Sequence, residues 1–384
     1  MTARVQEAFF ALLRAGMGLA PQGLETGQDP GTERGTGTGQ DQAKGLSIAA
    51  DLSPEEWEEL YAQARRHTVL GTIFDGLETL PSTEGIPMGL LARWAMTMDG
   101  MEKTGRLHEA VIKAQQEAWT RHGLKGYVLK GRTVAAMYPN PGHRTSGDID
   151  WWFGSEEDWR KANSIAASNT GSLTEDSDGD VHYTFKGVVV EHHRRWNDAS
   201  SRKARKALAG MKPDEPLAVL AMLNLHILKH AMVLGIGLRQ VCDLVMASRY
   251  LEYDAEALAG LLERCGLSKW TGLLSALTFK CFGVSIVPAE GEVNPKDVDM
   301  LLAMILADGN FGLETGRDAR SVAGSVWGRA GLFLRYAPAE FVARLWKLMK
   351  GRIVRNSNIT DDDENEKIID SRNRPDGIAG GLMY

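Results

Sequence analysis

The 384-residue sequence predicts an α+β fold in which a small mixed β-sheet is flanked by helical N- and C-terminal segments. Three observations support this fold class. Apolar residues at helical spacing dominate the chain before about residue 120 and after about residue 217. Short β-branched and aromatic runs are confined to the stretch between them. Hydrophobic residues make up 43% and charged residues 24%, which is typical of a globular protein with a large core.

Periodicity and composition divide the chain into six segments. These are an N-terminal helix (1–20), a flexible linker (21–46), a helical region (47–119), an α/β core (120–198), a helical C-terminal domain (199–352) and a disordered tail (353–384). The linker is rich in Gly, Thr, Gln and Asp and has few side chains to bury. The tail contains an acidic run and several glycines.

The N-terminal helices follow from apolar spacing and from capping residues. Val5, Phe9 and Leu12 share one face of the first helix. Ser53, followed by proline and two glutamates, predicts the start of a second helix. A long helix should then cover about 87–122, with a possible break at a glycine, and end at the stop signal His122-Gly123.

Strands and helices should alternate in the core. The predicted elements are a strand at 127–129, a short helix at 132–137, a strand at 149–153, a helix at 156–168, and two strands at 181–185 and 188–193. Lys186-Gly187 between the last two strands predicts a hairpin, because a two-residue link containing glycine suits such a turn.

Charge and composition also limit the function. Lys and Arg total 44 against 50 Asp and Glu, so the net charge of −6 argues against a general phosphate-backbone binder. Three cysteines exclude a disulfide scaffold and a four-cysteine zinc site. Polar residues interrupt the longest apolar stretch, 217–238, which favours a buried helix over a membrane span. The N-terminus does not read as a signal peptide, and we expect a cytoplasmic protein.

Two neighbouring strands carry candidate metal ligands. Asp148 and Asp150 alternate along one strand, so both side chains lie on the same face. Glu191 shares a face with His193 on a later strand and completes a three-carboxylate cluster if the two strands are neighbours. A divalent cation such as Mg²⁺ relieves the repulsion between such carboxylates. The alternatives are a solvated acidic turn for the pair and a charged strand end for Glu191.

A glycine between strand and helix marks a candidate phosphate site. Gly131 allows the backbone to approach a phosphate, and the following helix N-terminus offers free N–H groups. Lys130 or Arg132 could meet phosphate oxygens, and Thr133 could add a hydroxyl. A simple strand-to-helix turn explains the same residues.

Several further residues have both a functional and a structural interpretation. His226 and His230 could face the carboxylates or be core histidines. Arg239 could reach a nucleotide or pair with Asp243, and Arg144 could hold a triphosphate or offset the acids. The basic residues of 194–206 could bind a polyanionic acceptor such as tRNA or form a solvated helix face.

Together these motifs resemble the nucleotidyltransferase fold of the DNA polymerase β type, and within it a largely uncharacterised bacterial nucleotidyltransferase family. The residues that carry the resemblance are Leu129-Lys130-Gly131, Tyr138-Pro139, Arg144, Asp148-Ile149-Asp150, Glu191-x-His193, Trp57, Leu60, Ala64, His67, His226, His230, Leu238-Arg239, Asp243 and Gly309-Asn310-Phe311-Gly312. The likeness covers about residues 50–345. It departs from the wider superfamily in having Arg132 after Gly131 and 17 positions between Gly131 and Asp148.

The resemblance implies a metal-dependent enzyme that transfers NMP from an NTP to an unidentified acceptor, which could be a small molecule, a protein or RNA. Asp148, Asp150 and Glu191 would be the catalytic, metal-binding residues, with Mg²⁺ or Mn²⁺ as cofactor. The nucleotide-binding residues would be Lys130, Gly131, Arg132, Thr133, Arg144, His193, His230 and Arg239. No membrane and no stable nucleic-acid partner is expected. The alternatives are a non-catalytic nucleotide-binding or regulatory protein on the same fold and a toxin-like modifier of tRNA or protein.

Overall fold

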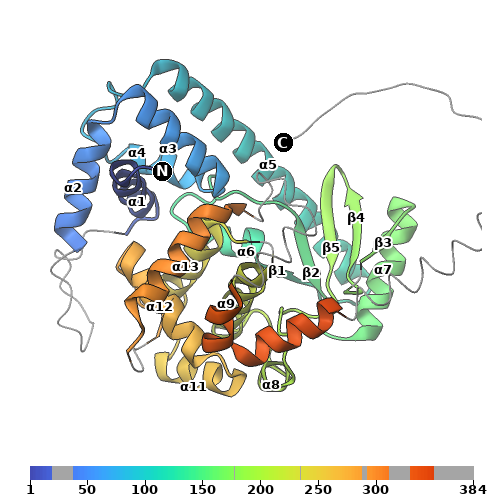
Figure 1. The fold of residues 1–384 in the computed structure, drawn as a ribbon. Helices are drawn as coiled ribbons and strands as arrows, with labels where there is room; N and C mark the ends of the chain where they lie inside the picture. The colour runs from blue at the N-terminus through green and yellow to red at the C-terminus, as the bar shows by residue number, and fades with distance from the viewer. Residues whose placement is uncertain (20–37, 177, 234, 288–291, 311–328, 350–384) are drawn as a thin grey trace, which may run out of the picture.

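A five-stranded mixed β-sheet lies among helices, so the predicted α+β class is confirmed (Figure 1). The computed structural model describes residues 1–19, 38–176, 178–233, 235–287, 292–310 and 329–349. The predicted tail at 353–384, most of the predicted linker and Phe311-Gly312 lie outside these residues.

The helices before the sheet and within it are α1 (Ala3–Gly16), α2 (Thr38–Ala50), α3 (Pro54–Arg66), α4 (Leu70–Leu77), α5 (Met88–Arg121), α6 (Gly131–Ala135) and α7 (Glu156–Thr170). The later helices are α8 (Arg202–Ala207), α9 (Pro216–Val233), α10 (Leu238–Tyr250), α11 (Ala255–Cys265), α12 (Ser268–Phe282) and α13 (Pro295–Asp308). Residues 329–336 and 338–349 are also helical. The strands are β1 (Tyr127–Leu129), β2 (Ile149–Trp152), β3 (Thr174–Glu175), β4 (Val181–Phe185) and β5 (Val188–His192).

The strand order is β1-β2-β5-β4-β3, with β2 and β5 parallel and the other pairs antiparallel. The predicted hairpin between β4 and β5 is confirmed. Its two linking residues, Lys186 and Gly187, both have positive φ, 51° and 81°, as a tight hairpin turn requires. The two-residue β3 was not predicted from the sequence.

The two faces of the sheet differ in character. One face is apolar: Ile149, Trp151 and Val190 pack with Trp119 of α5 and Trp159 of α7 in a continuous core. Because side chains alternate along a strand, Asp150 and Glu191 point to the other face. Burial of the apolar face therefore fixes the strands and presents the acids on the opposite side.

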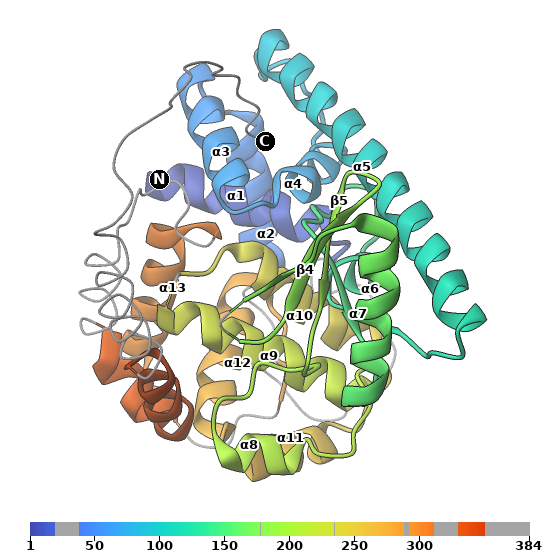
Figure 2. The same cartoon turned by 90° about the vertical axis from the view of Figure 1, so that its right-hand side faces the viewer.

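Helical layers surround the sheet. In Figure 1 the N-terminal helices lie above the C-terminal helices, and the sheet lies at one end with α7 beside it; Figure 2 shows α5 running alongside the sheet. Helix α9 is long and apolar enough to cross a membrane by length and composition, but 72% of that helix is buried inside the protein. This burial agrees with the predicted buried helix.

Local signals account for most helix boundaries, and one prediction was wrong. Ser53 caps α3 with the expected capping box. The linker predicted for 21–46 instead contains the start of α2 from Thr38. Gln42 holds this weakly apolar helix to α1 by donating to Ala11 O at 2.9 Å and accepting from Arg14 at 2.6 Å. Gly45 allows close approach to α1 at Ala11. Helix α5 is continuous, without the break considered at its glycines.

The buried His67 makes the fold sensitive to acid. Both ring nitrogens are buried without a hydrogen-bond partner in the described chain, and the ring packs 6.4 Å from that of Phe9. Burial, reinforced by the charge of Arg66, lowers the pKa of His67 to about 4. The unfolded chain, with a histidine pKa near 6.5, takes up this proton first as the pH falls.

We therefore predict that His67→Phe reduces the acid sensitivity of folding. Between pH 7 and pH 4.5 the wild type should lose about 2 kcal/mol more free energy of unfolding than the variant. Urea unfolding of both proteins across this range measures the difference. His122→Gln, at an exposed histidine, is the control and should follow the wild type. Parallel curves for wild type and His67→Phe would contradict the prediction.

Candidate active site

The strand register brings two predicted metal ligands together. Asp150 on β2 and Glu191 on β5 are direct Cα partners in the parallel pair, so their side chains project from neighbouring positions on one face. Leu129, at the end of β1, is the partner of Asp150 on the other side. The sequence prediction that Asp150 and Glu191 lie on adjacent strands is therefore confirmed.

His193 is the third member of this cluster. Ligand atoms of Asp150, Glu191 and His193 all lie within 4.8 Å of one another, which makes them a possible metal-binding group. The Nε2 atom of His193 donates to Asp150 Oδ1 at 2.5 Å and lies 3.5 Å from Glu191 Oε2. The sequence analysis had assigned this histidine to nucleotide binding and Asp148 to the metal.

Asp148 lies beside the cluster but outside it. It precedes β2, and its half-buried carboxylate makes no hydrogen bond or ion pair within the described residues. Its charge nevertheless acts on the cluster, because Asp148 contributes to the raised pKa of Glu191. Asp148 is therefore a neighbouring negative charge whose oxygens are not committed to another described residue.

The close carboxylates perturb one another. Burial, and then the charges of Asp148 and Asp150, raise the pKa of Glu191 to about 7. Burial opposes a charged ring at His193, but hydrogen bonds to Asp150 and Asp180 outweigh it and raise the pKa of His193 to about 10. At Asp150 burial is likewise outweighed, here by Lys130 and His193, so the pKa of this carboxyl falls below its usual range.

Lys130 is, after His193, the second basic side chain beside Asp150, and its backbone is strained. Its φ of 50° and ψ of −142° lie in a region that side chains rarely adopt. Its Nζ atom lies 3.7 Å from Asp150 Oδ1. Gly131 follows, also with positive φ, and a Cβ placed there would lie 3.6 Å from the carbonyl oxygen of Asp148. The predicted Lys-Gly turn therefore lies directly against the acidic strand.

A family model described as "Uncharacterised nucleotidyltransferase" matches residues 53–283, which is more than half of the chain. The chain belongs to this nucleotidyltransferase family. Comparisons with curated proteins and with solved structures found no match. The matched region contains the sheet, the acid cluster and the Lys130-Gly131 turn.

The candidate site has a further acid, Asp198, that was not predicted from the sequence. Asp198 accepts hydrogen bonds from His226 Nδ1 at 2.8 Å and Lys229 Nζ at 2.7 Å. It lines a cavity of about 30 Å³ together with Lys130, His193 and Lys229. His230 lies next to His226, with 4.4 Å between ring centroids. His226 and Lys229 lie three positions apart on α9, which places them on one face of the helix. No residue near Asp198 in the sequence indicated that this acid lies against that face.

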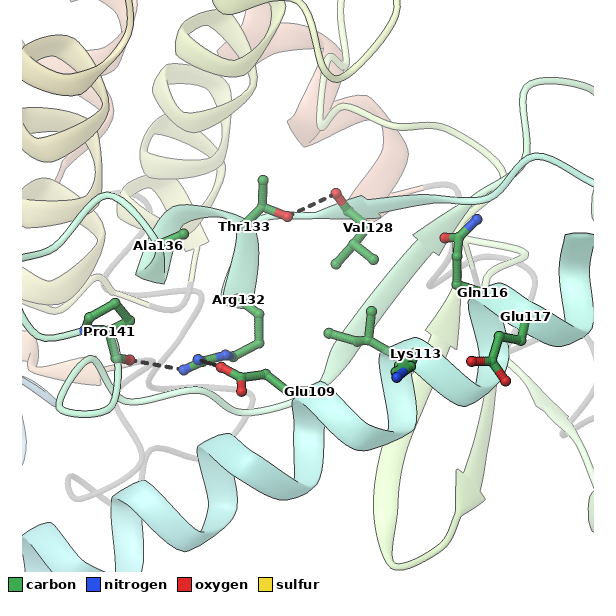
Figure 3. Close-up of a pocket in the computed structure, with 10 residues that line it drawn as sticks. Glu109, Lys113, Gln116, Glu117, Val128, Arg132, Thr133, Ala136 and Pro141 are labelled. Carbon is green, nitrogen blue, oxygen red and sulfur yellow. Dashed lines mark hydrogen bonds and ion pairs between the residues drawn. The ribbon is translucent and has the colours of Figure 1, made fainter.

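Two residues predicted to bind phosphate instead face the other side of the turn. Figure 3 shows Arg132 directed at Glu109 of α5 and at the carbonyl of Pro141, which it contacts at 2.9 Å. Thr133 donates to Val128 O at 3.2 Å. Both line a groove of about 560 Å³ between α5 and β1. Val128 points away from the face that carries Asp150, so this groove lies behind the acidic strand.

Arg144 is committed to a structural ion pair. Its Nε and Nη2 atoms donate to the two carboxylate oxygens of Asp243 at 3.1 and 2.5 Å, and Tyr138 also donates to Asp243. The considered pairing of Arg239 with Asp243 is wrong, because Asp243 is occupied by Arg144. Arg239 donates to Thr145 O at 3.0 Å, and its Nε is buried without a hydrogen-bond partner in the described residues.

The basic residues of 194–206, which follow the acid cluster in the chain, remain a predicted surface for an acceptor. In α8, Arg202, Lys203, Arg205 and Lys206 are exposed, which agrees with the solvated helix face considered above. Arg194 stacks over Trp159 at 4.5 Å. Trp151 is buried in the core behind the sheet, so it does not offer a base-stacking surface.

The Arg144–Asp243 pair yields a stability prediction. Asp243→Ala leaves a buried guanidinium without its partner, which should lower the free energy of unfolding by about 3–5 kcal/mol. Chemical denaturation measures the change. The control is Asp99→Ala, which removes an exposed partner of Lys103 and should cost less than about 1 kcal/mol. Equal effects of the two substitutions would show that Arg144 is not held in this way.

Proposed function

We propose that the chain transfers an NMP group from an NTP to an acceptor and releases pyrophosphate, with a divalent cation held at Asp150 and Glu191. The observation that carries the proposal is the convergence of these two carboxylates with His193, next to Asp148. Membership of a nucleotidyltransferase family supplies the reaction class. Clustered oxygen ligands and excess negative charge suit Mg²⁺ or Mn²⁺.

The reaction requires charge compensation more than covalent help from the protein. An acceptor oxygen forms a bond to the α-phosphorus, the bond from that phosphorus to the bridging oxygen breaks, and pyrophosphate leaves with the electron pair. Glu191, the cross-strand neighbour of Asp150, is the carboxylate placed to receive the proton of an acceptor hydroxyl. A bound cation would stabilise negative charge on the transferred phosphoryl group.

Cations of the chain itself are placed to hold the triphosphate. Lys130 is the closest, because its Nζ already lies at the acidic face. If a bound cation offset the charge of Asp150, the ammonium of Lys130 would be available to a phosphate oxygen. Arg239 is a second candidate, since its buried Nε has no hydrogen-bond partner in the described chain. Arg132 and Arg144 are engaged elsewhere and are not part of this proposal.

One observation favours the second candidate, a non-catalytic binding or regulatory protein on this fold. The cavity beside the cluster, of about 30 Å³, is far smaller than the few hundred Å³ of common ligand sites. Lys130 and His193 also compensate the charge of Asp150 from within the chain. Turnover would then require this side of the site to open, whereas a regulatory protein could remain closed.

Transfer of label from α-labelled NTPs in cell extract tests the proposal and identifies the acceptor. We expect label on an acceptor together with pyrophosphate release, and loss of both on metal removal. Asp150→Asn should reduce the rate by at least about 100-fold, because it removes a direct metal ligand. Asp99→Asn, on the exposed face of α5, is the charge-matched control. NTP binding without pyrophosphate release from any of the four nucleotides would favour the regulatory alternative.

A further inference from the structure

His193, and not Asp148, joins Asp150 and Glu191 in the group of possible metal ligands. Its Nε2 atom is the one that approaches both Asp150 Oδ1, at 2.5 Å, and Glu191 Oε2, at 3.5 Å. Asp148 is not a member of the group whose ligand atoms lie within 4.8 Å of one another. The donors that converge are therefore two carboxylates and one imidazole, a different set from three carboxylates.

A second acid fixes the direction of this imidazole. Asp180 Oδ2 accepts a hydrogen bond from His193 Nδ1 at 2.8 Å, so Nε2 is left facing the cluster. Asp180 is itself held, because its Oδ1 accepts the Arg194 backbone N–H at 2.9 Å. The backbone N–H of His193 donates to Trp151 O at 2.8 Å and anchors the residue beside β2. Histidines that bind metals in proteins usually donate their other ring nitrogen to a carboxylate in this way.

Glu191 is supported by the same segment of chain. His182 Nδ1 lies 3.0 Å from Glu191 Oε1, and its Nε2 lies 3.4 Å from Asp176 Oδ2. The second oxygen of Glu191 faces His193. The Asp180–His193 pair therefore orients His193 itself. The Asp176–His182 pair orients Glu191, which His182 contacts.

We propose that this cluster binds a divalent transition metal ion in preference to Mg²⁺, with His193 as nitrogen ligand and Asp180 as the residue that positions it. The inference rests on the proposed function only for the presence of a cation. Mg²⁺ prefers oxygen ligands in near-ideal octahedral geometry and retains its waters. Imidazole nitrogen suits divalent transition metals such as Fe²⁺, Ni²⁺ and Zn²⁺. Mn²⁺, the weakest binder of that series, shares the preference of Mg²⁺ for carboxylates and also accepts an imidazole nitrogen, so it is the most stringent probe of this assignment.

The charge balance of the cluster is consistent with this assignment. The Nε2 proton of His193 lies between two carboxylates. A metal ion held by Nε2 would take the place of that proton. Asp180 would remain the acceptor of the Nδ1 proton and would keep the orientation of the ring.

Electron paramagnetic resonance of Mn²⁺ bound to the chelator-treated full-length chain tests the proposal. We expect Mn²⁺ to bind at least about tenfold more tightly than Mg²⁺, measured by competition. The electron spin-echo signal should contain nitrogen modulation from an imidazole ligand, and His193→Gln should remove it. Asp180→Asn should weaken Mn²⁺ about 10–100-fold while changing Mg²⁺ affinity much less.

Asp178→Asn is the matched control for Asp180→Asn. Asp178 lies two positions earlier, but its carboxylate pairs with Lys347 Nζ at 2.5 Å. It should change Mn²⁺ affinity by less than about threefold, and thermal unfolding should show that all variants are folded. The proposal is overturned if wild-type Mn²⁺ shows no nitrogen modulation, if Mn²⁺ does not bind, or if Asp180→Asn weakens both metals equally.

The outcome is separable from that of the nucleotidyl-transfer assay. Nitrogen ligation of Mn²⁺ without label transfer would support the metal assignment and contradict the proposed reaction. Label transfer with Mg²⁺, together with Mn²⁺ that lacks a nitrogen ligand, would support the reaction and overturn the metal assignment.

Discussion

The structure around the candidate active site depends on how the chain offsets the repulsion between two carboxylates that the parallel β2–β5 register places side by side. Asp150 and Glu191 are direct cross-strand neighbours on one face, and like charges at such positions destabilise a sheet. The chain compensates with Lys130 and His193, and it accepts a strained backbone at Lys130 in doing so. A site that brings acids together at this cost is typical of catalysis or metal binding.

The free energy that holds the acids in place comes from the opposite face of the sheet. Trp151, Phe153 and Val190 are buried against α5 and α7, and a register slip of one residue would expose them. The cost of exposing these apolar side chains fixes which residues of β2 and β5 point to the acidic face. On the side of the acidic face, Asp198 forms a partly buried ionic group with His226 and Lys229 of α9. Asp198 and Lys229 line the same small cavity as Lys130 and His193. The site therefore lies between two hydrophobic cores that are independent of its chemistry.

The sequence predicted what depends on local pattern and missed what depends on tertiary contact. Strand alternation was enough to place Glu191 and His193 on one face, and the Lys186-Gly187 turn was enough to predict the hairpin. Asp198 and Asp180 carry no local signal, because their partners lie 28 and 13 positions away. The start of helix α2 was missed because its apolar pattern is weak: hydrogen bonds between Gln42 and α1 supplement the packing of Leu46, Ile48 and Ala49.

The presence of Arg132 directly after Gly131, where the resemblance to the wider superfamily leads one to expect a small residue, has a structural explanation. The positive φ values at Lys130 and Gly131 turn the chain so that Lys130 faces the acids and Arg132 faces α5. Arg132 then ties α6 to Glu109 and to the Pro141 carbonyl, at the point where Gly105 leaves room for its guanidinium. Arg144 is used in the same way, against Asp243 on α10. The two arginines that look like phosphate ligands in the sequence are therefore structural. Arg132 ties α6 to α5, and Arg144 ties the segment before β2 to α10, whereas the side chain of Lys130 faces the acids.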